Sequence, residues 1–239
     1  MAPMNPPAQA PVPVKKSVAR EYLESVVVAV ILALFIRTFV VQAFKIPTGS
    51  METNLLIGDH LLVNKLVYSP SFGVLEDLLL PKRQVRRGDV VVFKYPEDPG
   101  RDFIKRVIGL PGESVEVRDK TVLIDGKPLD EAGYVHFLDS GLRPEDPEYG
   151  LRGGRAGFGP VRVPEGQLFV LGDNRDNSKD SRYWGFLPRD QVKGRALIVY
   201  WSYEASREEY HRTGVLDWLR DTAQSFGKTR WKRFFHLIR

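Results

Sequence analysis

One long apolar run near the N-terminus constrains this chain more than any other feature. It extends from Ser25 to Phe44, "SVVVAVILALFIRTFVVQAF", and contains a single charged residue, Arg37. A helix of about 20 apolar residues is long enough to cross the hydrocarbon core of a bilayer. The run therefore predicts one transmembrane helix, which we assign to residues 22–44.

The charges in front of the run indicate its orientation. Lys15, Lys16 and Arg20 precede it, with no acidic residue before Glu21. Basic flanks favour the cytoplasmic side of a membrane. We therefore expect the Pro- and Ala-rich residues 1–21 to form a disordered cytoplasmic tail, and the rest of the chain to lie outside.

Two other interpretations of the run are possible. A cleavable signal sequence has a shorter apolar core and a small-residue cleavage site, and "RTFVVQAFKIP" offers no clean site of that kind. A buried core helix would explain Val26 to Ile36, but the apolar character resumes after Arg37. A single-pass anchor accounts for the whole run.

Composition excludes several classes of protein. The chain has no cysteine, which rules out disulfides, thiolate metal sites and cysteine nucleophiles. Its net charge is +5, without a helix-turn-helix, zinc-finger or RNA-binding motif, so we expect a lipid bilayer and no nucleic acid as its partner. We expect no metal site, because the four histidines lack the spacing of metal ligands: His60, His136, His211 and His236.

Short β-like runs follow the apolar run, separated by turn signals such as Pro-Gly at Pro111 and Asp-Gly at Asp125. They predict a mainly β fold, an antiparallel β-sheet domain over residues 45–203. The runs are "HLLVNKLVY" from His60, "DVVVFKY" from Asp89, "FIKRVIGL" from Phe103, "SVEVRDKTVLIDGKPL" from Ser114, "QLFVLGD" from Gln167 and "RALIVYWSY" from Arg195.

Two segments depart from the strand pattern. Residues 129–164 are rich in Gly, Pro and charge, and we expect a small β-ribbon or irregular extension there. Residues 204–239 form a basic, aromatic C-terminal tail with near-helical spacing. This tail fits either a terminal helix packed on the core or a segment lying on an anionic bilayer.

The stretch "FKIPTGSMETNLLIGDH", directly after the anchor, contains Ser50 between Gly and Met. A serine nucleophile needs a base and donors for the oxyanion. None of the histidines lies in a motif-like context, and His60 stands in a predicted strand. Lys105 is the alternative base, because burial in the apolar strand "DFIKRVIGL" would lower its pKa and leave a neutral amine. Most lysines face solvent, so an ordinary surface residue is the competing interpretation.

A polar block, "GDNRDNSKDSRYWGF", follows the apolar strand that begins at Gln167. Such a block can be a simple polar turn whose side chains bond their own backbone. It can also supply the Ser178 hydroxyl to orient a lysine amine, with Asp180 and Arg182 as a charge pair that holds the loop.

Together these blocks resemble the bacterial type I signal peptidases, or leader peptidases, which are membrane-anchored Ser–Lys endopeptidases. The resemblance extends from the anchor to Tyr203, in the family's order: "IPTGSM…LLIGDHLLVNKLVY", "RGDVVVFKYP", "DFIKRVIGLPGE" and "GDNRDNSKDSRYWGF". It implies that Ser50 is the nucleophile and Lys105 the general base. It further implies that the hydroxyl of Thr48, where the family usually has serine, helps the Ser50 N–H to line the oxyanion hole.

The resemblance assigns further roles. Ser178 matches the residue that positions the lysine amine, Asp180 and Arg182 match a structural pair, and Met51 matches the substrate-binding edge. After Ser-Met the family commonly has Pro-Thr-Leu, whereas this chain has "ETNLL". That departure concerns the loop conformation and not the dyad.

The implied activity is removal of signal peptides from secretory preproteins, after small residues at Ala-X-Ala sites, through an acyl-enzyme and without a cofactor. The implied location is the bacterial cytoplasmic (inner) membrane, with the catalytic domain on its outer face. A self-cleaving repressor-type Ser–Lys peptidase is one alternative, but it would be soluble and would carry a DNA-binding module. A non-enzymatic, membrane-anchored β-domain that binds partners is the other.

Overall fold

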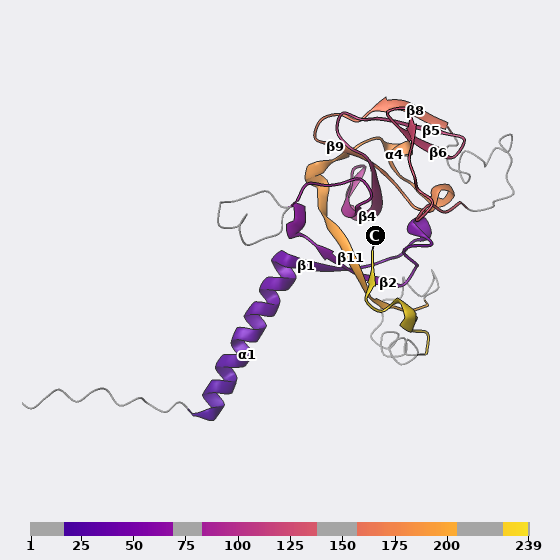
Figure 1. The fold of residues 1–239 in the computed structure, drawn as a ribbon. Helices are drawn as coiled ribbons and strands as arrows, with labels where there is room; N and C mark the ends of the chain where they lie inside the picture. Colours follow the sequence, from indigo (N-terminus) through magenta and orange to yellow (C-terminus); the bar gives the residue numbers. More distant parts are fainter. Residues whose placement is uncertain (1–16, 69–82, 138–156, 205–226, 239) are drawn as a thin grey trace, which may run out of the picture. The chain divides into compact units, whose positions relative to one another are not determined.

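The computed structural model describes residues 17–68, 83–137, 157–204 and 227–238 (Figure 1). The chain divides into two compact units, Met1–Thr38 and Phe39–Arg239. Most of the expected cytoplasmic tail, residues 1–16, lies outside the described residues. So do residues 138–156 of the expected extension and residues 205–226 of the C-terminal tail.

The first unit carries the apolar helix α1 (Val18–Phe35), which continues into a π-helical turn, Ile36–Val40. The span Val18–Val40 has 23 residues and a mean hydropathy of 2.3, which is long and apolar enough to cross a membrane. None of the residues in its most apolar window is buried, which disfavours the alternative of a core helix.

The helix ends earlier than we expected. We predicted that it continues to Phe44, but Val41–Lys45 forms strand β1, paired antiparallel with β2 (Asp59–Asn64). The reason is that β-branched and aromatic residues suit a strand as well as a membrane helix, and the distant partner β2 decides between the two. The apolar run Ser25–Phe44 therefore contributes residues both to the helical span and to strand β1.

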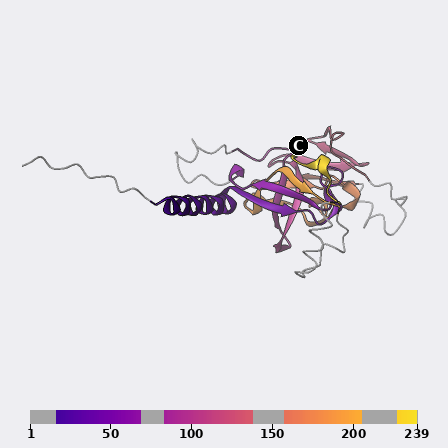
Figure 2. The same cartoon turned by 90° about the horizontal axis from the view of Figure 1, so that it is seen from below.

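The second unit contains two antiparallel sheets (Figures 1 and 2). The mainly β, antiparallel fold that the strand-like runs predicted is confirmed, whereas the division into two sheets was not predicted. The larger sheet has the order β1-β2-β11-β3-β4-β9-β10, with β12 paired to β11. Its remaining strands are β3 (Val90–Tyr95), β4 (Asp98–Gly109), β9 (Gln167–Leu171), β10 (Leu187–Pro188), β11 (Val192–Ser202) and β12 (His236–Leu237).

The smaller sheet has the order β7-β6-β5-β8 and groups at the top of Figure 1. It consists of β5 (Ser114–Arg118), β6 (Thr121–Ile124), β7 (Lys127–Pro128) and β8 (Gly157–Arg162). Strand β8 belongs to the segment that we expected to be a ribbon or irregular extension. Its pairing with β5 joins that segment to the domain.

Strand β9 and the second part of β4, from Lys105 to Gly109, are buried on both faces. Ile108 and Phe169 pack against the smaller sheet, whereas Val107 and Val170 pack into a separate cluster around Phe93. This explains why "QLFVL" reads as a continuous apolar run rather than an alternating one. A strand enclosed in this way is a rigid support for any polar side chain that it carries.

The described end of the C-terminal tail is not an α-helix. A 3-10 turn, Trp231–Arg233, leads into β12, and Ile238 is buried in the core cluster that includes Val63 and Val199. The tail therefore completes the larger sheet. The pairing joins Leu237 to Ile198 and His236 to Val199.

Candidate active site

Ser50 lies in a 3-10 turn, Gly49–Met51, a few residues after the end of β1. The turn is buried, and Ser50 itself is 7% exposed. Its Oγ lies 2.7 Å from Nζ of Lys105, which comes from β4. The fold thus brings together a hydroxyl and an amine that are 55 residues apart in the chain.

Lys105 is 3% exposed, and its Nζ also donates a hydrogen bond to the carbonyl of Ile104 at 2.9 Å. The Phe103 ring covers the amine, with its centroid 5.4 Å from Nζ. Burial lowers the pKa of Lys105 from 10.5 to about 8, because the charged ammonium loses its hydration. The carboxylates of Asp180 and Asp173 raise this pKa in part. A neutral amine is therefore accessible near physiological pH.

The polar block after β9 holds the Ser50 turn in place. The backbone N–H of Asn174 donates to the carbonyl of Ser50 at 3.2 Å, and its side-chain amide donates to the carbonyl of Gly49 at 3.1 Å. Gly172 lies against the same turn, since a Cβ there would be 2.5 Å from the Ser50 carbonyl oxygen. Two segments far apart in the sequence thus form one compact site.

Ser178 is buried in this block, and its Oγ has no hydrogen-bond partner among the described residues. A Cβ on Gly172 would be 2.2 Å from Ser178 Oγ, so the hydroxyl lies beside the Ser50 turn. The expected hydrogen bond from Ser178 to the Lys105 amine is not formed in the part of the chain that the structure describes.

Asp180 and Arg182 form a buried ion pair with two hydrogen bonds, both of 2.8 Å. Asp180 also accepts from the backbone N–H of Gly172 and caps the short helix α4 (Ser181–Trp184). Arg182 in turn donates to the carbonyl of Arg175 at 2.7 Å. The pair therefore ties the two ends of the polar block together.

Thr48 and Met51 differ in accessibility. Thr48 is exposed and precedes the 3-10 turn, and its side chain makes no capping hydrogen bond. Met51, which we expected at a substrate-binding edge, is 0% exposed and packs in the core cluster with Leu55 and Leu61. Met51 therefore supports the Ser50 turn from beneath rather than lining a surface.

Sequence reasoning missed a second buried ion pair next to the lysine. Arg106 follows Lys105 and makes two hydrogen bonds to Asp173, of 2.7 and 2.6 Å, with both side chains 1% exposed. Asn54 donates to the same carboxylate at 2.8 Å. The signal available in the sequence was Arg106 itself, a charged residue inside an apolar strand. Its partner Asp173 is distant in the sequence, so the pair could not be identified from local pattern. A similar buried pair joins Arg175 to Glu131.

His60, the alternative base, lies in different surroundings. Its Nδ1 is 3.5 Å from the Tyr200 hydroxyl, and its ring packs against Trp201 and Tyr203. Burial and the nearby Lys45 lower the pKa of His60 to about 4. The neighbouring Asp59 accepts hydrogen bonds from Arg233 instead. These contacts give no Ser–His–Asp arrangement around Ser50.

Comparison with known proteins adds an independent finding. Residues 19–201 match the family model described as "Signal peptidase, peptidase S26". A probable signal peptidase I-2 of Synechocystis sp. is 42% identical over 184 residues, covering 74% of this chain and 71% of the relative. A signal peptidase I of Leptolyngbya laminosa is 39% identical, covering 83% and 89% of the two chains. One of Aquifex aeolicus is 34% identical, covering 77% and 84%.

Proposed function

Because the chain belongs to the signal peptidase family, peptidase S26, and is a membrane-anchored enzyme of that family, we propose that Ser50 and Lys105 form its catalytic dyad. The observation that carries the proposal is the 2.7 Å separation of Ser50 Oγ from a buried lysine amine. A lysine with a lowered pKa can act as the base that a serine nucleophile requires.

The reaction that we propose begins with neutral Lys105, which accepts the Ser50 proton while Oγ attacks the scissile carbonyl carbon. The backbone N–H of Ser50 and the hydroxyl of Thr48 hold the resulting oxyanion. Lys105 then gives its proton to the leaving amine, which departs as the peptide bond breaks. Water, deprotonated by the same amine, hydrolyses the acyl-enzyme and restores Ser50.

The surrounding residues have supporting roles in this proposal. Ser178 orients the Lys105 amine, and its buried, unpaired hydroxyl beside the Ser50 turn supports that role. The Asp180–Arg182 pair holds the polar block in register. Met51 contributes to the substrate-binding edge indirectly, by fixing the turn that presents Ser50.

The proposed substrates are secretory preproteins, cut after an Ala-X-Ala type site. An extended substrate segment can pair with an exposed strand edge, where alternate small side chains enter shallow pockets. We further propose that the chain spans the bacterial cytoplasmic membrane once, with its N-terminus in the cytoplasm. Its β domain then acts on the outer face, where a membrane-inserted substrate has a raised effective concentration.

The test is cleavage of a detergent-solubilised preprotein with a small-X-small site, after circular dichroism has established that each variant is folded. Ser50→Ala and Lys105→Met should each lose at least about 100-fold in rate, because each removes a group that reacts. Lys94→Met is the matched control, since Lys94 is an exposed residue of the adjacent strand β3. If Lys105→Met cuts as fast as the wild type, the base lies elsewhere. If the wild type is inert, an anchored binding domain becomes the better description.

A further inference from the structure

The polar block after β9 presents a charged side chain to solvent close to the dyad. Within residues 172–182 every residue is buried except Asn177 and Lys179. The backbone is extended at Ser178, with φ −134° and ψ 123°, and at Asp180, with φ −137° and ψ −164°. Successive side chains of an extended backbone point to opposite sides, so Lys179 points outward from between two residues that face the site.

Lys179 makes an ion pair with the tip of the hairpin that carries Lys105. Strands β3 and β4 are joined by a turn of two residues, Pro96 and Glu97. The Lys179 ammonium donates to the Glu97 carboxylate at 2.9 Å, and the two side chains are 57% and 53% exposed. An ion pair with this exposure is weak, because water screens it. Another carboxylate can therefore take the place of Glu97.

Two stacked rings connect Lys179 to the buried amine of Lys105. The Lys179 ammonium lies 5.1 Å from the centroid of the Tyr95 ring. The Tyr95 and Phe103 rings stack with centroids 4.2 Å apart, and the Phe103 centroid lies 5.4 Å from Lys105 Nζ. Extended chain rises about 3.3 Å per residue, so a substrate segment of about four residues that ends in an acidic side chain can span this stack.

The part of a substrate that leaves first begins at Lys105. In the proposed reaction Lys105 gives its proton to the leaving amine, which becomes the N-terminus of the mature protein. The mature segment therefore starts beside the Phe103 ring that covers Lys105. Lys179 is the exposed cation at the other end of the same ring stack.

Lys179, rather than Glu97, is the member of the ion pair that can turn to a substrate. Glu97 also accepts a hydrogen bond from the Tyr95 hydroxyl, so it keeps a partner when the lysine leaves. Lys179 carries its charge on a flexible four-carbon stem with three rotatable donors. The exchange of one carboxylate for another therefore leaves no charged group without a partner.

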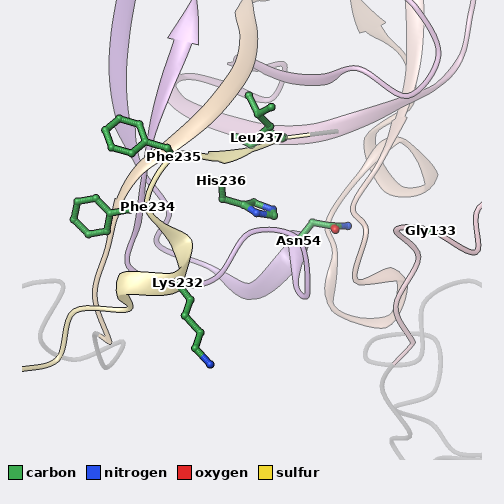
Figure 3. Close-up of a pocket in the computed structure, with 8 residues that line it drawn as sticks. Asn54, Gly133, Lys232, Phe234, Phe235, His236 and Leu237 are labelled. Atoms are coloured by element: carbon green, nitrogen blue, oxygen red, sulfur yellow. The ribbon is translucent and has the colours of Figure 1, made fainter.

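The exposed Lys232 is not placed for the same role. It lines a pocket of about 530 Å³ with Asn54, and in Figure 3 its side chain points away from Asn54. Asn54 donates to Asp173, the partner of Arg106. Arg106 and Lys105 are consecutive on β4, so their side chains point to opposite faces of the strand. The pocket therefore lies on the Arg106 face and not beside the reacting amine.

We propose, on the basis of the proposed dyad, that Lys179 is a specificity-determining residue that binds an Asp or Glu side chain among the first four residues of the mature segment. The substrate carboxylate replaces Glu97 on the Lys179 ammonium, while Glu97 stays on the Tyr95 hydroxyl. The enzyme then favours preproteins whose mature part begins with an acidic residue. This preference is separate from the one for small residues before the cut.

The test uses the full chain in detergent and a series of preproteins that differ only in one of the first four residues after the cut, which is Gln, Glu or Lys. We expect kcat/KM for Glu to exceed that for Gln about three- to fivefold at one of these positions, mainly through KM, since an exposed ion pair has about this effect. Lys179→Gln should bring this ratio to about 1. Lys179→Glu should reverse the preference toward Lys. Lys127→Gln, on β7 of the smaller sheet, removes the same charge and should keep the wild-type ratio.

Three outcomes would overturn the proposal: equal rates for Gln and Glu substrates at all four positions, a preference for Glu that persists in Lys179→Gln, or a preference of the wild type for Lys, which would assign the binding to Glu97. Each ratio is taken within one enzyme, so a loss of folded protein in a variant cancels. A wild type that cuts none of the substrates contradicts the proposed function and this proposal with it. Cleavage of the Gln substrate without a preference for Glu contradicts the role of Lys179 alone.

Discussion

At the scale of single residues, the site contains buried polar atoms that the described fold leaves unpaired. Ser178 Oγ and Asn174 Oδ1 are both buried without a hydrogen-bond partner among the described residues. An unpaired buried polar group costs about 1–3 kcal/mol, so such groups are uncommon unless they serve another purpose. Their position against the Ser50 turn suits groups that form bonds only when substrate is bound.

Ser178→Ala is expected to separate catalysis from stability. The free energy of unfolding should stay within about 0.5 kcal/mol of the wild type, because Ser178 Oγ forms no hydrogen bond with the described residues. The cleavage rate should fall about 10- to 100-fold if Ser178 orients the Lys105 amine as we propose. Urea unfolding and initial cleavage rates check the two parts.

Ser181→Ala is the matched control, because Ser181 Oγ accepts from the Val170 N–H at 3.0 Å. Removing that acceptor leaves a buried donor unpaired and should cost about 1–2 kcal/mol of stability. An unchanged cleavage rate for Ser178→Ala would show that Ser178 has no part in positioning the lysine.

At the scale of elements, the polar block after β9 and the turn that carries Ser50 fit together without spare room. Gly172→Ala should destabilise the fold by about 1–3 kcal/mol, because its Cβ would be 2.2 Å from Ser178 Oγ and 2.5 Å from the Ser50 carbonyl oxygen. The displaced turn should also slow cleavage.

Gly157→Ala in β8 is the control, since the new Cβ would be 4.0 Å from its nearest neighbour, the Val117 carbonyl oxygen. Equal melting temperatures for the two variants would contradict the close fit.

The C-terminal segment stabilises the loop that follows Ser50. Arg233 pairs with Asp59, whose side chain is 0% exposed, and also donates to the carbonyl of Asn54 at 2.7 Å. Arg233→Ala should therefore lower the free energy of unfolding by about 3 kcal/mol, since it leaves a buried carboxylate without its partner. Denaturant unfolding of the full chain in detergent measures this loss.

Arg118→Ala provides the comparison for that measurement. Arg118 pairs with Glu116 at the surface, where its side chain is 64% exposed, and such a pair contributes about 0–1 kcal/mol. A loss of stability in Arg233→Ala no larger than in Arg118→Ala would mean that the C-terminal segment does not hold the loop.

At the scale of the whole molecule, the sequence predicts the parts that depend on local pattern. Alternation and β-branched residues located the strands, and the apolar run located the membrane span. The predicted end of the helix was wrong because β1 is defined by its pairing with β2. Strand β12 was missed because it depends on its pairing with β11. Contacts across long separations, such as Arg106 with Asp173, carry no local signal. The pairing of Ser50 with Lys105 was predicted from the apolar strand around Lys105, with a surface lysine as the competing interpretation, and family resemblance then favoured it.

The most direct test of the central claim is the pH dependence of kcat/KM for a soluble peptide substrate, measured with the full chain in detergent from pH 4 to pH 10. The active form requires a neutral lysine, and burial lowers the pKa of Lys105 to about 8. We therefore expect kcat/KM to rise with pH, with a midpoint near 8, and to fall about tenfold per pH unit well below that midpoint. A profile flat across this range, or a midpoint near 4 as the buried His60 would give, would contradict Lys105 as the base.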